Sequence, residues 1–242
     1  MKYIFLFASG LLFTCSSDRS ESQKIIDNTI EVYGGDRFLK GTIEFDFRER
    51  HYVTRRNGGV FSHERIFKDT AGNVIHDYLT NDGFHREIND KHASIPDTMA
   101  VKYTRSVNST IYFALLPYGL NDPAVRKKLL GKTTFNGQSY FIVEITFEQQ
   151  GGGEDFNDIF LYWIHEQTFS LDYMAYLYFT DGGGLRFRRA FNRREVNGIS
   201  FQDYVNYQPK GDSATIDQME RLYKEGSLEE LSKIELRNIQ VY

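Results

Sequence analysis

Six histidines are the side chains of this sequence best suited to metal binding or acid–base catalysis: His51, His63, His76, His85, His92 and His165. The first four fall on successive segments of strand-like periodicity, where neighbouring strands can bring side chains together. None of them has the i, i+4 spacing of a zinc-binding helix, and no cysteine stands beside them. A slip of one residue in register turns a strand side chain to the other face, so their orientation stays open. We interpret them as scattered strand residues and predict no metal site.

Three acids beside a run of glycines form a second candidate site, for calcium. Glu154, Asp155 and Asp158 follow Gly151, Gly152 and Gly153. Calcium takes oxygen ligands, but the alternating acids and closing glutamate of an EF-hand loop are absent. We predict a hairpin loop with solvated acids.

Five arginines form the densest cluster of charge: Arg186, Arg188, Arg189, Arg193 and Arg194. In a strand, Arg186 and Arg188 share one face, and the apolar residues next to them share the other. Such a pair can hold a phosphate or carboxylate through bidentate hydrogen bonds. The alternative is a solvated face on which they pair with Glu144 or Asp172 of neighbouring strands.

Motifs of the common enzyme classes are absent from the sequence. It has no Gly-x-Ser-x-Gly nucleophile elbow, no phosphate-binding loop and no dinucleotide fingerprint. Lys102 and Lys132 have no context that marks a Schiff-base lysine. The sequence therefore predicts no cofactor and favours a protein without catalytic residues. An envelope enzyme that uses His51, His76 or His85 with an acid at a cavity mouth remains an alternative.

The composition is that of a folded protein rich in aromatic residues. The 242 residues are 40% apolar and 26% charged, with 20 Phe and 16 Tyr. These values exclude general disorder and collagen-like order, and they favour strands. The net charge of −4 argues against nucleic-acid binding.

The N-terminus has the pattern of a secretory signal. Lys2 precedes a mostly apolar run over 3–13, which is too short to span a bilayer. Leu12-Phe13-Thr14-Cys15 resembles a bacterial lipobox, although its second and third residues are not the usual small ones. We predict a signal peptide over 1–14, lipidation of Cys15, the only cysteine, and a polar tether over 15–22. A plain secretory signal with an incidental cysteine is the alternative.

Periodicity predicts mainly β structure with two substantial helices. Apolar residues at helical spacing predict a helix over 21–33, with Ser20 as its cap and Gly34-Gly35 as its end. A second helical pattern runs from Asp97 to Leu116, and a short one surrounds Met219. About eleven segments have strand periodicity: 42–56, 60–68, 74–80, 84–88, 132–135, 141–148, 159–165, 170–179, 185–195, 199–207 and 234–241. The absence of β-α-β alternation excludes a parallel fold.

The order of these elements resembles the periplasmic lipoprotein carriers and receptors of the Lol type. The segment 162–168, Tyr-Trp-Ile-His-Glu-Gln-Thr, is similar to their Trp-Ile-Asp-x-x-Thr hairpin, with His165 in place of the acid. A closer similarity is to an uncharacterised family of bacterial lipoproteins, through segments 120–125, 151–158 and 182–188. The resemblance implies an unclosed antiparallel β-barrel of about eleven strands over 23–242, a single domain with its inserted helix covering the mouth.

The resemblance also implies an apolar cavity and a place in the cell envelope. We expect a non-enzymatic lipoprotein of the Gram-negative outer membrane, on its periplasmic or surface face, that binds an apolar ligand such as an acyl chain. Candidate ligand-binding residues are Phe45, Phe47, Phe141, Val143, Phe147, Trp163 and Tyr173, with Arg186 and Arg188. Alternatively, the apolar residues only pack against the helices, and the protein is a structural surface lipoprotein whose two arginines contact a partner.

Overall fold

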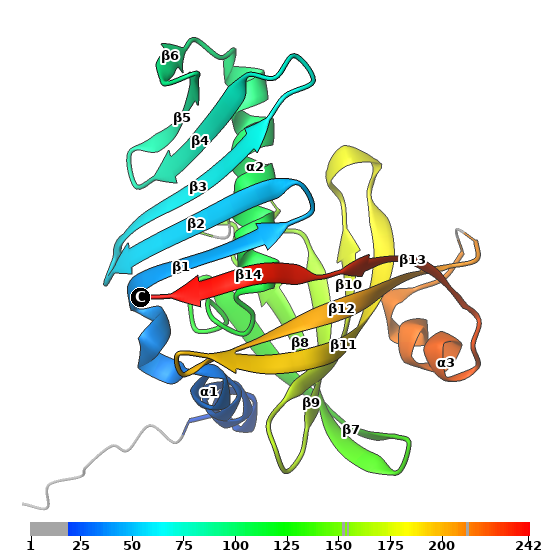
Figure 1. Ribbon diagram of the computed structural model, residues 1–242. Helices are drawn as coiled ribbons and strands as arrows, with labels where there is room; N and C mark the ends of the chain where they lie inside the picture. The colour runs from blue at the N-terminus through cyan, green and yellow to red at the C-terminus, as the bar shows by residue number, and fades with distance from the viewer. Residues whose placement is uncertain (1–18, 152, 154, 212) are drawn as a thin grey trace, which may run out of the picture.

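The computed structural model describes residues 19–242 apart from 152, 154 and 212, and it consists of two antiparallel sheets with helices between and beside them (Figure 1). Residues 1–18 lie outside the described residues, so the signal peptide and Cys15 do too. In the part that is described, no helix has the length and apolar character needed to cross a membrane.

The first sheet contains seven strands, and six of them follow one another along the chain. Its order is β14-β1-β2-β3-β4-β5-β6. The bounds are β1 Lys40–Phe47, β2 Arg50–Asn57, β3 Val60–Lys68, β4 Val74–Thr80, β5 Gly83–Ile88, β6 Lys91–Ala93 and β14 Leu236–Val241.

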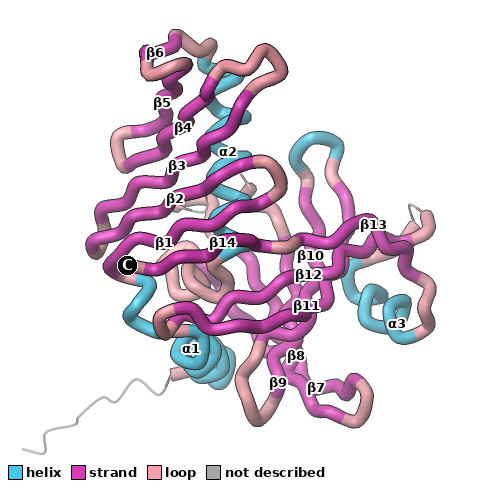
Figure 2. The backbone as a smooth tube through the Cα atoms, viewed as in Figure 1, coloured by secondary structure: helices cyan, strands magenta, loops and turns pink. Residues whose placement is uncertain are grey.

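The second sheet has the order β13-β12-β11-β10-β9-β8-β7 and also contains seven strands. The bounds are β7 Val125–Phe135, β8 Gln138–Phe147, β9 Ile159–His165, β10 Leu171–Tyr178, β11 Gly184–Val196, β12 Ile199–Pro209 and β13 Leu228–Ile234. Its strands cross those of the first sheet (Figure 2).

The C-terminal segment links the two sheets along one edge only. β13 ends the second sheet and β14 ends the first, with a single residue between them. At the other ends, β6 and β7 are not paired with each other. The result is a half-barrel that is open on one side, which confirms the predicted fold class.

The fourteen strands exceed the predicted eleven by three, for local reasons. β1 and β2 were read as one strand, because the turn between them contains Arg48 in a left-handed conformation (φ 55°) instead of a glycine. β6 has only three residues, and β13 alternates weakly because most of its side chains are exposed.

Helix α1, Glu21–Tyr33, has the predicted bounds. The Ser20 hydroxyl accepts a hydrogen bond from the Gln23 amide at 3.2 Å, and Gly34 ends the helix with φ 138°. Residues 21 and 22 are therefore helical and do not belong to the tether that was predicted over 15–22. The 3₁₀ turn η1, Gly35–Phe38, leads from α1 into β1.

Helix α2, Asp97–Ala114, passes between the two sheets in addition to covering the opening (Figure 1). The helix contacts β3, β4 and β5 of the first sheet. Its second half reaches the other sheet, where the Tyr112 and Tyr162 hydroxyls lie 3.2 Å apart. The ring of Phe113 lies 5.3 Å from that of Tyr176. This helix is therefore the inner wall of the half-barrel for both sheets.

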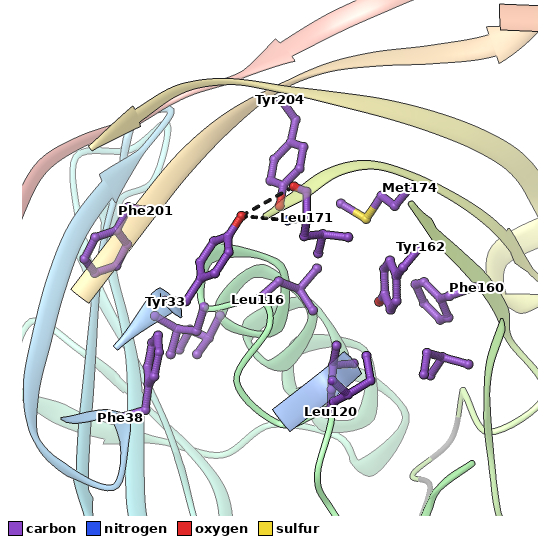
Figure 3. Packing of buried hydrophobic residues seen from close by; sticks show 14 of the residues in the cluster. Tyr33, Phe38, Leu116, Leu120, Phe160, Tyr162, Leu171, Met174, Phe201 and Tyr204 are labelled. Atoms are coloured by element: carbon purple, nitrogen blue, oxygen red, sulfur yellow. Dashed lines mark hydrogen bonds between the residues drawn. The ribbon is translucent and has the colours of Figure 1, made fainter. Parts of the chain in front are cut away.

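The main core fills the space between α1, α2 and the inner faces of both sheets (Figure 3). The Tyr33 hydroxyl connects α1 to the second sheet, because it donates to Gln202 Oε1 at 2.7 Å and accepts from the Leu171 amide at 3.1 Å. A second cluster lies on the opposite face of that sheet, beneath the 3₁₀ turn η3, Ile216–Gln218, and helix α3, Met219–Lys224. The central strands β9 and β10 are therefore buried on both faces.

Candidate functional site

A large cleft of about 890 Å³ opens between the tip of the β2–β3 hairpin, α2 and the second sheet. Such a volume is within the range of about 300–1,000 Å³ that is typical of small-molecule sites. Twelve apolar or aromatic side chains line it: Phe61, Ile111, Tyr112, Phe113, Leu115, Tyr118, Ala124, Val125, Phe147, Phe160, Tyr176 and Tyr178. We refer to it as the large cleft.

Polar groups at the first-sheet side of the large cleft are held by neighbouring side chains. Arg56 donates from Nη1 to the Tyr118 hydroxyl at 3.1 Å and lies 4.3 Å from the centre of that ring. His63 is buried, and its Nδ1 lies 2.8 Å from Thr54 Oγ1. Burial and the positive charge of Arg56 lower the pKa of His63 to about 3. The imidazole is therefore neutral at pH 7.

The opposite side of the large cleft carries a buried acid from the glycine-rich loop. Burial raises the pKa of the Asp158 carboxyl to about 6, and the negative charge of Asp155 adds to the rise. The Phe179 amide donates to Asp158 Oδ1 at 3.3 Å. The expectation of solvated acids in this loop is thus wrong for Asp158. Glu154 lies outside the described residues.

A small cleft of about 310 Å³ lies on the other side of α2, where the two sheets approach each other. Its walls come from the β1–β2 turn, the second half of α2, and β11 to β14. Ser106, Ser109 and Phe113 of α2 line both clefts. The two spaces are therefore separated by the thickness of one helix. We refer to this space as the small cleft.

Four of the nine candidate ligand-binding residues line one of the two clefts. Phe147 and Arg186 line the large cleft, and Phe47 and Arg188 line the small one. Three others belong to the packed core without lining either cleft: Phe45, Phe141 and Val143. These three residues fit the alternative interpretation, in which the apolar residues only pack inside the half-barrel.

Trp163 and Tyr173 lie on the wrong side of the second sheet for this role. They belong to the second cluster, where Trp163 Nε1 donates to Glu220 Oε2 of α3 at 2.9 Å. The expectation that they line the cavity is wrong. Aromatic residues occur on both faces of these strands, so composition alone could not tell which face is the inner one.

The arginine pair shares one face, as alternation predicts, but it has no acidic partner on the neighbouring strands. Arg186 donates to the Tyr178 hydroxyl at 3.0 Å, and Arg188 donates to the Tyr176 hydroxyl at 2.8 Å. Asp172 instead accepts from Arg193 at 2.7 Å. The suggested pairing with Asp172 is therefore wrong.

The histidines proposed for an enzyme lie on the outer face of the first sheet. His76 Nε2 is 3.0 Å from Glu64 Oε2, but His76 alternates with Asp77 and the core residue Leu79, which point inward. His51 and His85 share that outer face by register. Among the described residues, no group of three or more His, Cys, Asp or Glu is placed to hold a metal ion. The structure gives no support to the enzyme alternative.

Sequence reasoning missed most of the polar groups that line the clefts. His63 is the one histidine of the first meander on the inner face, and its register was not readable from the sequence. Ser106 and Ser109 lie on the polar side of the predicted helix, which has the appearance of a solvent-exposed face. Ser106 and Ser109 could be recognised as cleft residues only once the helix was known to lie between the two sheets.

Comparison with known proteins shows a family and a fold. A family model described as a family of unknown function, DUF6503, matches residues 2–236. No significant match occurs among curated proteins. The structure is similar to that of a DUF1329 family protein from Desulfovibrio piger, with 12% sequence identity, a TM-score of 0.51, and coverage of 92% of this chain and 93% of that chain.

A LolA superfamily protein from Nitrosomonas europaea also matches, with 10% identity, a TM-score of 0.49, and coverage of 92% of this chain and 94% of that chain. At such identities the similarity is one of fold. The family model confirms the expectation of an uncharacterised family, and the match to the DUF1329 family protein is one of fold.

Proposed function

The chain belongs to the DUF6503 family of unknown function, and we propose that it is a non-enzymatic envelope lipoprotein that binds an apolar ligand in the large cleft. The ligand is an acyl chain or a molecule of similar chemistry. Cys15 carries the lipid anchor, and residues 23–242 form one ligand-binding domain behind it.

The observation that carries this proposal is the apolar lining of the large cleft. Aromatic rings from both sheets and from α2 surround the space. The centre of the Phe160 ring lies 6.2 Å from the ring centres of both Tyr112 and Phe113. Burying apolar surface of a ligand there is favourable by about 25 cal/mol per Å². Polar side chains also line the cleft, on both sheets, on α2 and on the glycine-rich loop, and groups of this kind fix the orientation of a bound molecule.

Native mass spectrometry of the full chain, purified gently from membranes, tests the proposal. We expect a non-covalent, lipid-sized adduct on the folded protein that disappears under denaturing conditions. Ser109→Trp adds a large ring at a position of α2 that lines the large cleft, so the adduct should be largely lost.

The matched control is Val101→Trp, which adds the same ring to an exposed position of the same helix, 39% accessible and outside both clefts. This variant should retain the adduct. A wild-type protein that shows only its apo mass would contradict the proposal.

Lipidation of Cys15 is a separate prediction. Replacement Cys15→Ser should abolish incorporation of labelled fatty acid and leave the protein unprocessed or soluble, because lipidation requires the thiol. Metabolic labelling with fractionation of membranes provides the measurement. If the variant is still cut after Thr14 and still partitions with membranes, the plain secretory signal is the correct interpretation.

A further inference from the structure

Arg188 is a buried cation whose guanidinium group has no acidic partner among the described residues. Its side chain lies on β11, and the residue is 7% accessible to solvent. Nη2 donates to the Tyr176 hydroxyl at 2.8 Å. Nε and Nη1 are also buried and have no hydrogen-bond partner within the described chain.

The other two arginines that are buried to this extent show how different Arg188 is. Arg65 and Arg86 are 3% and 7% accessible, and both donate to the carboxylate of Asp77. Burying a cation without a paired anion is costly, and each buried donor left without a partner adds to that cost. Arg65 and Arg86 avoid this cost through Asp77, whereas the N–H groups on Nε and Nη1 of Arg188 have no partner among the described residues.

Aromatic rings surround the guanidinium of Arg188 and hold it in place. Its central carbon lies 4.1 Å from the centre of the Phe113 ring, 5.0 Å from that of Tyr176 and 5.9 Å from that of Tyr204. Cation–π contacts of this kind stabilise the charge but use none of its N–H groups. The fork of donors is therefore oriented before any ligand arrives.

The small cleft in front of Arg188 has the lining of an anion site. No aspartate or glutamate is among its lining residues, which include Arg48 and Arg50 in addition to Arg188. Ser106, Ser109 and Ser232 add hydroxyl groups to the lining, whereas the Thr110 hydroxyl donates to the Ser106 carbonyl at 2.9 Å. Asn206 lies directly opposite Arg188 in register, and its buried Oδ1 has no described partner. Rotating that amide by half a turn turns its NH₂ group toward the same space.

We propose that the small cleft binds an oxyanion, a carboxylate or phosphate, through the N–H groups of Arg188 that have no partner in the described part of the chain. The anion is either a free ion or the head group of an amphiphile. The second source is sterically reasonable, because Phe113 and Ser109 line both clefts, so a head group in the small cleft is one helix away from a chain in the large one. The site itself does not depend on the proposed function, since a free anion satisfies it as well.

The test compares anionic and uncharged probes on the full chain in nonionic detergent. Calorimetry measures binding of inorganic phosphate, and native mass spectrometry compares laurate with dodecanol, its uncharged analogue. We expect at least one of the two anions to bind. If laurate binds about tenfold or more tightly than dodecanol, the oxyanion is the head group of an amphiphile. If phosphate binds and laurate binds no more tightly than dodecanol, the oxyanion is a free ion.

Variants connect the binding to Arg188. Arg188→Met should abolish phosphate binding and the preference for laurate, and Arg188→Lys should retain only part of either, because an ammonium lacks the planar fork. Arg126→Met, at an exposed arginine outside both clefts, removes one charge elsewhere and should bind as the wild type does. Should Arg188→Met not fold, the lysine variant and the wild-type comparison still decide.

Two results would overturn the proposal. One is a wild type that binds no phosphate and does not distinguish laurate from dodecanol. The other is a folded Arg188→Met protein that binds either anion as tightly as the wild type. The two proposals can fail separately. If dodecanol binds, Ser109→Trp abolishes this binding, and laurate binds no more tightly than dodecanol, the apolar ligand site in the large cleft is supported and the oxyanion site is contradicted.

Discussion

Replacement of Asp77 by alanine is expected to lower the free energy of unfolding by about 3–5 kcal/mol. The carboxylate is fully buried and accepts from Arg65 Nε at 2.9 Å and from Arg86 Nε at 2.5 Å. Its removal leaves two cations buried side by side without an anion. Urea unfolding of the purified full chain, followed by circular dichroism, measures the change.

The matched control is Glu148→Ala, at an exposed ion pair with Arg126 in which the carboxylate side chain is 49% accessible. Exposed pairs contribute only about 0–1 kcal/mol, so this variant should unfold nearly as the wild type does. An Asp77→Ala protein no less stable than the Glu148→Ala protein would show that Asp77 is not the anion that compensates the two arginines.

Replacement of Ile111 by alanine is expected to cost about 2–5 kcal/mol of stability, through lost apolar burial and the space left behind. Ile111 is 1% accessible and lies in the second half of α2, where the helix belongs to the core of both sheets. The same unfolding experiment measures it. Because Ile111 also lines the large cleft, bound ligand should be removed first, since a ligand adds stability to the folded state.

Val101→Ala on the exposed side of α2 is the control, and surface changes of this kind usually stay within about 0.5 kcal/mol. Equal stability of the two variants would mean that α2 is a detachable cover rather than an inner wall. The position of Ile111 in the core excludes the interpretation of the apolar stripe as a free surface that awaits a partner.

Local pattern was sufficient for many elements of this fold. The capping residues Ser20 and Gly34 and the apolar spacing between them predicted α1 with its observed bounds. Strands β3 and β4 were predicted residue by residue, because glycine or asparagine turns separate them from their neighbours. In both cases the information lies within a few residues of the element itself.

Local pattern failed where a boundary or a face depends on distant contacts. The turn at Arg48 carries no glycine, so β1 and β2 were read as one strand. Trp163 and Tyr173 have the same alternation as the residues that line the clefts. The central strands β9 and β10 are buried on both faces, by the main core on one side and by the cluster beneath α3 on the other, so alternation cannot identify their inner face.

The sequence by itself determined the β-rich class, the helix before the strands, the second helix within the strand pattern, and the shared face of Arg186 and Arg188. Only the tertiary structure decided that α2 lies between the sheets and divides the interior into two clefts, and that Arg188 is buried among aromatic rings without an acid. The physical reason is the distance along the chain over which each kind of interaction acts. Periodicity and turns are set by neighbours along the chain, whereas burial and charge pairing depend on strands and helices many residues apart.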